Sequence, residues 1–429
     1  MERSIGIGLL GAGTVGGTLV SRLIGDAEAI SSKTGLTFDV RRVGVQNLEK
    51  QRPFSFTPGL LTDQLEEVVD DPSVDLVVEV MGGLDPAGDL ILRALEAGKP
   101  VISANKELIA ARGPELIAAA EKSGVPFLFE AAVGGGIPII RPLSETLAGE
   151  KIDRVLGIVN GTTNFILTQM SEQGAAYDVA LKEAQTLGYA EPDPTADVSG
   201  ADAAAKAAIL ASLAFGTWVG IGDVYHEGIE AITAVDIGFA EDFGYVVKLI
   251  GVCERVEAGI SARVHPAMIP LDHPLAGIRG ATNAIFIEGP TIESLLFAGP
   301  GAGGDPTATA VLGDMIDAAR ETLAGAQVAP RIRFSPGELV AFEDVSTEWY
   351  VRLIVDDKPG VLAKIASGFG DAGVSIRSVW QEGGETKADL IVVTYPAPER
   401  AQREALRSLS TIDEVTDIGS VIRVLGPSR

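Results

Sequence analysis

A glycine-rich turn between an apolar strand and a helix constrains the fold of this chain most strongly. Residues 4–10 form an apolar run typical of a buried strand, and residues 18–30 have the pattern of an amphipathic helix. The six residues that follow the strand are Gly11, Ala12, Gly13, Thr14, Val15 and Gly16. Glycines at this spacing allow a tight turn and let a pyrophosphate approach the N-terminus of the helix. We therefore predict that these six residues bind a dinucleotide.

Strand and helix patterns continue to alternate over the first third of the chain. The remaining predicted elements are strands at 38–45, 74–80, 100–103 and 126–129 and helices at 61–69, 86–97 and 113–123. This alternation is typical of an α/β fold with a parallel, doubly wound sheet of the Rossmann type.

The rest of the chain predicts two further domains. Helices and strands mix after residue 135, which indicates an α+β domain. The order from residue 348 onwards is β-α-β-β-α-β, the ferredoxin-like pattern. The predicted limits are 1–135 for the Rossmann-type domain, 136–325 for the α+β domain, 326–347 for a linker and 348–429 for the ferredoxin-like domain.

Composition excludes several classes of partner. The chain of 429 residues carries 59 acidic and 34 basic residues, a net charge of −25. Such a charge argues against binding to nucleic acid or to an anionic membrane surface. Cys253 is the only cysteine, so an internal disulfide is excluded, and we expect a reducing, cytoplasmic location. The sequence predicts neither a signal peptide nor a membrane span.

An acidic loop leads into an alanine-rich helix at 200–215. Asp202 and Lys206 are the only charges in that helix and lie four residues apart, so they share one face. Buried charges are costly unless they are paired or used. Two interpretations are open: an ion pair that stabilises the helix by about 0.2–0.5 kcal/mol, or a site to which Glu191, Asp193 and Asp197 of the loop also contribute.

Lys106 follows the strand predicted at 100–103. Ligands of open α/β sheets bind at the carboxyl ends of the strands. A lysine at this edge could polarise a carbonyl or pair with a substrate carboxylate, and the alternative is a solvated loop lysine.

The tip of the second strand bears on the choice of cofactor. Residues 43–47 contain no acid that could hold the ribose 2′-hydroxyl of NAD. Arg41, Arg42, Lys50 and Arg52 lie close by, which favours NADP and leaves NAD open.

Another glycine-rich turn follows Glu130. Its backbone carbonyls, beside the carboxylate, offer only oxygen ligands, which suit a hard cation. A plain tight turn is the alternative interpretation.

Together these segments resemble the homoserine dehydrogenase family over essentially the whole chain. The motifs that carry the resemblance are Gly11-Ala-Gly-Thr-Val-Gly16, Ser103-Ala-Asn-Lys106, Glu130-Ala-Ala-Val-Gly-Gly-Gly-Ile137, Asn160-Gly-Thr-Thr-Asn164 and Leu187-Gly-Tyr-Ala-Glu-Pro-Asp-Pro194. The tail resembles an ACT domain, an amino-acid-sensing module, with Asp356-Asp-Lys-Pro-Gly-Val-Leu362 as its first strand–helix turn. It departs from that pattern at Tyr395, where many ACT domains carry a histidine.

The resemblance implies the NAD(P)-dependent interconversion of L-homoserine and L-aspartate 4-semialdehyde, in threonine, methionine and isoleucine biosynthesis. It implies that Lys206 donates a proton to the aldehyde oxygen, directly or through water, and that Lys106 assists catalysis and contacts cofactor or substrate. Glu191 and Asp202 would bind the substrate, and Asp197 would hold the acidic set in place.

The family also implies ligands for the cofactor and for a metal ion. Gly188 and Gly304 would approach the cofactor. The implied sodium ligands are Glu130 and the carbonyls of Val133, Gly135 and Ile137.

The ACT-like tail predicts feedback inhibition by L-threonine, and the family implies a homodimer or homotetramer. Two alternatives differ in class. One is another NAD(P)-dependent oxidoreductase of amino-acid metabolism, and the other is an amino-acid sensor that keeps a vestigial nucleotide-binding fold.

Overall fold

The computed structural model describes residues 3–52, 56–57, 59–325, 331–384 and 386–426. The chain forms two compact units that interleave along the sequence. The first unit contains residues 1–152, 208–221 and 289–336, and the second contains 153–207, 222–288 and 337–429. The predicted domain limits are sequential and stay a prediction; the first part of the predicted linker, 326–330, lies outside the described residues.

The first unit contains a six-stranded sheet in which every described pair of strands is parallel. The strands are β1 (Arg3–Leu10), β2 (Leu36–Gly44), β3 (Leu61–Thr62), β4 (Leu76–Glu79), β5 (Val101–Ser103) and β6 (Phe127–Leu128), in the order β3-β2-β1-β4-β5-β6. This order is that of the Rossmann fold, with its topological switch point between β1 and β4. The prediction of a parallel, doubly wound sheet is confirmed.

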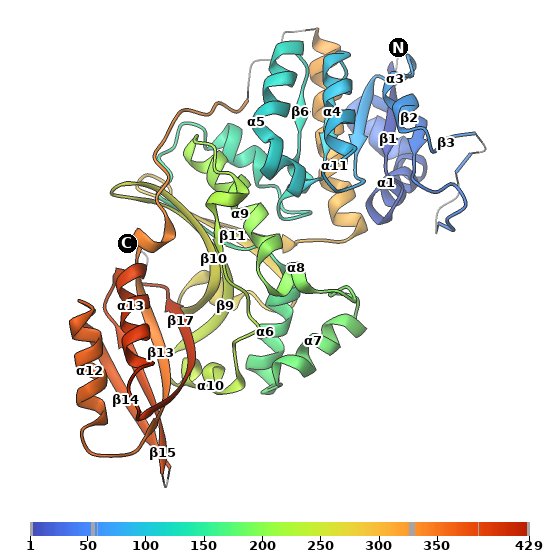
Figure 1. Ribbon diagram of the computed structural model, residues 1–429. Helices are drawn as coiled ribbons and strands as arrows, with labels where there is room; N and C mark the ends of the chain where they lie inside the picture. The colour runs from blue at the N-terminus through green and yellow to red at the C-terminus, as the bar shows by residue number, and fades with distance from the viewer. Residues whose placement is uncertain (1–2, 53–55, 58, 326–330, 385, 427–429) are drawn as a thin grey trace. The chain divides into compact units, whose positions relative to one another are not determined.

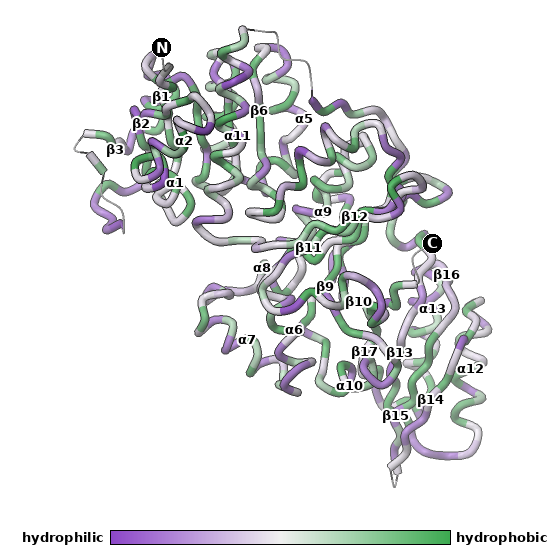
Figure 2. Tube along the Cα trace, turned by 180° about the vertical axis from the view of Figure 1, so that it is seen from behind, coloured by the Kyte–Doolittle hydropathy of each residue, from purple (hydrophilic) through white to green (hydrophobic). Residues whose placement is uncertain are grey.

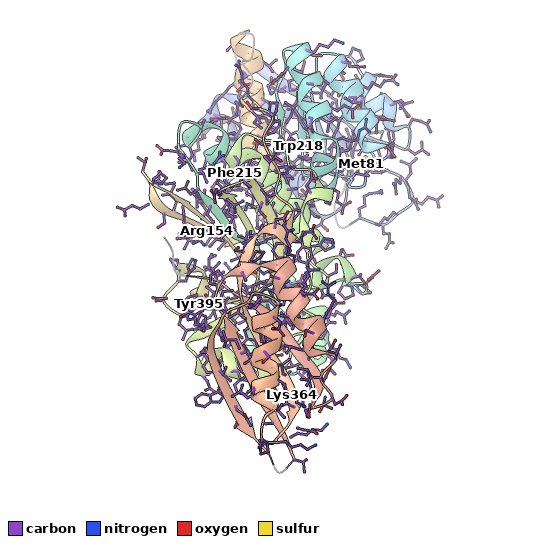
Figure 3. The ribbon with its side chains drawn as sticks, turned by 60° about the vertical axis from the view of Figure 1, so that its left-hand side comes forward. Met81, Arg154, Phe215, Trp218, Lys364 and Tyr395 are labelled. Carbon is purple, nitrogen blue, oxygen red and sulfur yellow. The ribbon has the colours of Figure 1, made fainter. Side chains whose placement is uncertain are left out.

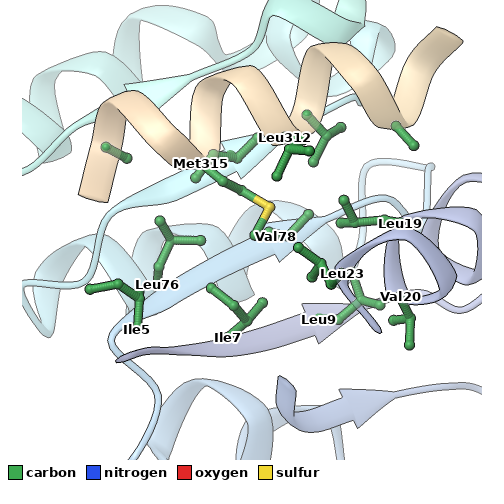
Figure 4. Close-up of a cluster of buried hydrophobic side chains, with 14 of the residues drawn as sticks. Ile5, Ile7, Leu9, Leu19, Val20, Leu23, Leu76, Val78, Leu312 and Met315 are labelled. Carbon is green, nitrogen blue, oxygen red and sulfur yellow. The ribbon is translucent and has the colours of Figure 1, made fainter. Parts of the chain in front are cut away.

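Helices cover this sheet, and the apolar core of the first unit lies between the helices and the sheet. The helices are α1 (Thr14–Gly25), α2 (Ala27–Thr34), α3 (Leu65–Asp70), α4 (Ala87–Glu96), α5 (Lys106–Ser123) and, from much later in the sequence, α11 (Gly304–Ala324). Figure 4 shows Leu312 and Met315 of α11 packed over Val78 of β4, beside Leu19 and Leu23 of α1. The return of α11 closes one face of the nucleotide-binding sheet.

Three predicted helices differ from the structure. The helix expected at 61–69 begins at Leu65, because residues 61–62 form β3, which pairs with β2. The helix expected at 18–30 begins at Thr14 and ends at Gly25, because glycine disfavours a helix interior, and α2 follows. The helix expected at 113–123 begins at Lys106, since the Leu108 N–H donates to the Asn105 side chain, which caps it.

A mixed sheet runs through the second unit and into the tail. Its strands in the second unit are β7 (Arg154–Ile158), β8 (Tyr225–His226), β9 (Tyr245–Val256), β10 (Gly259–Pro270), β11 (Thr282–Gly289), β13 (Ser346–Asp356), β14 (Ile376–Gly383), β15 (Lys387–Thr394), β16 (Ala397–Pro398) and β17 (Val415–Val424). A further strand, β12 (Glu293–Pro300), belongs to the first unit by sequence. The order β11-β7-β9-β10-β17-β13-β15-β14 places the tail in the same sheet as the preceding part, through parallel pairing of β10 with β17. Figure 2 shows the apolar character of β9 and β10 at the centre of this sheet.

The tail confirms the predicted β-α-β-β-α-β order. Its helices α12 (Val361–Asp371) and α13 (Glu399–Leu409) pack against each other and cover one face of the tail strands (Figure 1). Lys364 of α12 pairs with Glu414 at 2.6 Å, and Tyr395, after β15, is exposed; both are labelled in Figure 3. The unpredicted feature is that this module shares a continuous sheet with its neighbour.

The remaining helices of the second unit carry the acidic loop and its surroundings. They are α6 (Gly161–Gln173), α7 (Tyr177–Thr186), α8 (Thr195–Val198), α9 (Ala201–Phe215, which continues into the first unit) and α10 (Ala234–Asp242). None of the described helices is both long enough and apolar enough to cross a membrane.

Candidate active site

The glycine loop of the first unit has three distinct steric environments. Gly11 has φ +103°, and an added Cβ would lie 2.8 Å from the Val80 carbonyl oxygen. A Cβ on Gly16 would lie 2.1 Å from the Gly11 carbonyl oxygen, whereas Gly13 has no atom within 4 Å of that position. This is the division of roles in a dinucleotide loop: a tight turn, an open approach for pyrophosphate, and close helix–strand packing. Ala12 lies inside the loop, and Thr14 and Val15 form the start of α1.

A buried acid that the sequence analysis missed fixes the neighbouring loop. Glu79 ends β4, is fully buried, and accepts hydrogen bonds from the Met81 and Gly82 N–H groups at 2.8 and 3.1 Å and from Ser103 at 2.7 Å. Burial raises the pKa of Glu79, and these hydrogen bonds oppose the shift. Met81 is labelled in Figure 3. A single acid among the apolar residues 76–80 was the available signal.

Lys106 lies at the first position of α5, directly after the carboxyl end of β5, and is partly buried. The side-chain amide of Asn105 donates to the Gly83 carbonyl at 2.7 Å, which ties this helix start to the loop after β4. Gly304 begins α11, where an added Cβ would lie 2.6 Å from the Thr18 hydroxyl oxygen. Gly304 therefore permits α11 to pack closely on α1 beside the glycine loop.

The basic residues near β2 are mostly engaged. Arg41 pairs with Asp39 at 2.9 Å and Arg42 with Asp71 at 3.0 Å. Arg52 donates to the carbonyl of Asn47 at 2.6 Å, which places its guanidinium at the loop that follows β2.

The second unit gathers the lysine and two of the predicted acids. The Lys206 ammonium donates to the Val159 carbonyl and to Asp202, each at 2.7 Å. The Asn160 side-chain amide donates to Asp202 at 2.9 Å and to Asp197 at 2.7 Å. Both interpretations of the sequence therefore meet here, since the i,i+4 ion pair forms and is also part of a polar cluster.

Asn160 is a further member of this cluster, which the sequence analysis did not single out. It is 4% exposed, and its carbonyl oxygen Oδ1 accepts the Thr163 N–H at 2.8 Å, so it also caps α6. Its only signal was its place in the segment 160–164.

The cluster is shielded and leaves donor capacity for a ligand. The side chains of Lys206 and Asp202 are 12% and 11% exposed. Burial raises the pKa of Asp197, and the charge of Asp202 adds to the effect, while Asn160 and Lys206 oppose it. An ammonium group has three N–H donors, and the described residues to which Lys206 donates take up two of them.

The part of the acidic loop that contains Glu191 stays apart from the cluster. Glu191 is exposed, and its carboxylate forms no hydrogen bond or ion pair with any described residue. Gly188 has φ +79°, and an added Cβ would have no atom within 4 Å. The structure thus joins Asp197, Asp202 and Lys206 and does not bring Glu191 to them.

The predicted sodium site lies at the glycine-rich turn after Glu130. The Glu130 carboxylate accepts the backbone N–H groups of Ile139, Ile140 and Arg141, so both of its oxygens are engaged. The remaining ligands in the prediction, at Val133, Gly135 and Ile137, are backbone carbonyls. Among the described residues no cluster of three or more His, Cys, Asp or Glu side chains could hold a metal, so this turn fits at most an ion held mainly by carbonyl oxygens.

A neighbouring acid is coupled to the same turn. Asp314 of α11 accepts the Glu130 N–H at 2.8 Å and pairs with Arg141 at 3.1 Å. Burial raises the pKa of Asp314 to about 7, and the charge of Glu130 adds to the shift.

A dinucleotide loop on a Rossmann-type sheet and a shielded lysine–carboxylate cluster are the parts of a nicotinamide-dependent oxidoreductase. Three family models match the chain: homoserine dehydrogenase, NAD binding domain, over residues 11–130, homoserine dehydrogenase over 138–316, and the ACT domain over 349–413.

Named relatives agree over the full length. The chain is 46% identical to homoserine dehydrogenase of Mycobacterium leprae, covering 100% of this chain and 99% of the relative, and 45% identical to that of Corynebacterium glutamicum, covering 98% and 96%. A crystal structure of homoserine dehydrogenase from Thiobacillus denitrificans matches with a TM-score of 0.93 at 41% identity, covering 99% of this chain and 98% of that one. A hyperthermophilic archaeal homoserine dehydrogenase in complex with NADPH matches with a TM-score of 0.60 at 29% identity, covering 76% and 100%. The chain belongs to the homoserine dehydrogenase family and is an NAD(P)-dependent oxidoreductase with a C-terminal ACT domain.

Proposed function

We propose that this protein interconverts L-homoserine and L-aspartate 4-semialdehyde, with NADP as its preferred cofactor. The observation that carries the proposal is the cluster of Asn160, Asp202 and Lys206, which presents an oriented ammonium group in a chain of this family. The position of Arg52 beside the β2 tip supports NADP over NAD. The archaeal relative in complex with NADPH also favours that choice.

The chain's own residues must move one proton and hold the substrate. When bound, the nicotinamide cofactor supplies a hydride to the aldehyde carbon or accepts one from the alcohol carbon. Lys206 gives a proton from Nζ to the aldehyde oxygen in reduction and takes one from the hydroxyl in oxidation, directly or through water. Asp202 holds Lys206 through their 2.7 Å hydrogen bond, and Asp197 supports the set through Asn160.

The other expected roles complete the proposal. Asp202 and Glu191 bind the substrate ammonium group, which for Glu191 requires the exposed loop to move toward the cluster. Lys106 assists catalysis, and Gly188 and Gly304 border the cofactor. A sodium ion, if held, takes the carbonyls of Val133, Gly135 and Ile137 with Glu130 completing the site.

Replacement of the lysine tests the proposal. Lys206→Met should lower kcat for homoserine oxidation by at least about 100-fold, because a general acid–base group is lost. Initial rates with NADP and with NAD measure this loss and rank the cofactors. Lys182→Met, at an exposed lysine of α7, is the control and should retain normal rates. Near-normal turnover by Lys206→Met would contradict the assigned role.

The ACT domain carries the regulatory part of the proposal. We expect L-threonine to bind this domain and inhibit the reaction, in a homodimer or homotetramer. Initial rates across millimolar L-threonine, on a protein sized by light scattering, test both points. Rates that do not respond to L-threonine would reject this effector.

A further inference from the structure

A buried arginine of the ACT domain reaches into the neighbouring part of the second unit. Arg423, on β17, is 4% exposed and donates to both carboxylate oxygens of Glu399 at 3.1 and 3.2 Å. Its remaining terminal nitrogen donates to Glu227, which lies outside the ACT domain. Tyr225 also donates to that carboxylate, at 3.0 Å. The two parts are therefore joined by a charge pair as well as by the pairing of β10 with β17.

The segment that carries Glu227 lies directly against the backbone before α9. The Ile229 N–H donates to the Val198 carbonyl at 2.9 Å. A Cβ on Gly228 would lie 2.1 Å from that carbonyl oxygen, and a Cβ on Gly200 would lie 3.1 Å from the Glu227 carbonyl oxygen. The two backbones are in contact, with no side chain between them at these positions.

This contact falls at the base of the catalytic cluster. Val198 ends α8, one residue after Asp197, and Gly200 precedes α9, which carries Asp202 and Lys206. A shift of the 227–229 segment therefore displaces the backbone from which three of the cluster side chains project.

We propose that Glu227 is a positioning residue, whose pair with Arg423 holds the 227–229 segment against the start of α9 and so links the ACT domain to the placement of Asp202 and Lys206. The inference rests on the proposed function for its consequence in catalysis. Its structural part stands on the contacts alone.

Glu227→Ala is the appropriate variant. The Glu227 side chain is 33% exposed, so its removal leaves no large buried void, and Arg423 keeps its partner Glu399. The control is Glu348→Ala, which removes an ion pair with Arg377 inside the ACT domain.

Hydrogen–deuterium exchange of the full-length chain gives a readout that does not depend on activity. Glu227→Ala should speed exchange about tenfold in peptides covering 195–207, relative to the reference strand β9, because local opening at the start of α9 becomes easier. Glu348→Ala should leave those peptides unchanged. Equal exchange of 195–207 in wild type and Glu227→Ala, or an equal increase in both variants, would overturn the proposal.

Kinetics tests the consequence. Glu227→Ala should lower kcat/KM for homoserine about tenfold with an unchanged KM for the cofactor, since small misplacement of a catalytic group is costly. Unchanged kcat/KM would also overturn the proposal. The Lys206→Met variant, assayed beside Glu227→Ala, separates the catalytic claim from the positioning claim. Full activity of Lys206→Met would reject the catalytic roles of the proposed function. The exchange result would still decide whether Glu227 holds the start of α9.

Discussion

At the scale of single residues, Asn160 connects local structure to the proposed chemistry. One end of its side chain caps α6, and the other donates to Asp202 and Asp197. Loss of a cap typically costs about 1 kcal/mol, whereas loss of the two donated bonds releases the carboxylates that orient Lys206. The cap therefore contributes to the stability of the fold, and the two donated hydrogen bonds contribute to the rate of the reaction.

Asn160→Ala should therefore lower kcat for homoserine oxidation more than its effect on stability accounts for. We expect a loss of about tenfold or more, because the carboxylate that holds Lys206 is no longer fixed. Thr233→Ala is the control, since Thr233 caps α10 in the same way through the Asp236 N–H. If both variants lose stability and activity alike, Asn160 is only a helix cap.

A second residue-scale prediction concerns Asp314, whose pKa is raised by burial to about 7. The folded state then binds a proton that the unfolded chain has released, so this group favours folding at low pH and loses that contribution as pH rises from about 4 to about 7. The slope is at most about 1.4 kcal/mol per pH unit. Asp314→Asn should flatten the fall of melting temperature between pH 5 and pH 8. A wild-type profile that rises across this range in parallel with the variant would contradict the assignment.

At the scale of elements, the glycine loop separates binding from folding. Gly13 has open space at its Cβ position and φ −81°, which alanine adopts readily. Gly13→Ala should therefore keep the wild-type melting temperature and raise the KM for NADP at least about tenfold, because the methyl group occupies the approach of the pyrophosphate. Gly16→Ala is the contrasting variant, since its Cβ would meet the Gly11 carbonyl oxygen and should lower the melting temperature. Equal stability of the two variants would refute this division of roles.

The helices and strands, and their order, were the features that the sequence predicted best. The Rossmann-type sheet and the ferredoxin-like order followed from periodicity and from the glycine spacing, because both are local signals. Glu79 and Asn160 escaped because their roles arise from hydrogen bonds to residues distant in sequence or to separate loops. Local patterns also could not predict the position of the Glu191 side chain, which is exposed and lies apart from Asp202.

At the scale of the whole molecule, the ACT domain is built into the sheet of the second unit. The β10–β17 pairing and two charge pairs join it to the preceding part: Arg423 with the partly exposed Glu227, and the buried pair of Arg352 with Asp236 at 2.8 Å. Asp236 is fully buried and also accepts Ser420 of β17. The ACT domain is therefore joined to the preceding part by a shared sheet rather than by a flexible tether.

Deletion of the residues after Ser346 should consequently damage the remaining chain rather than yield an unregulated enzyme. Removing one partner of a buried ion pair costs about 3–5 kcal/mol, and the deletion removes the partner of Asp236 and exposes an edge of β10. We expect the melting temperature to fall by at least about 5 °C, measured by calorimetry beside the full-length protein. Asp236→Asn in the truncated chain should restore part of the lost melting temperature, because it removes the buried carboxylate that no longer pairs with Arg352. A truncated protein with unchanged melting temperature and unchanged homoserine turnover would mean that the domain is independent, and that any L-threonine response travels through the oligomer instead of through this sheet.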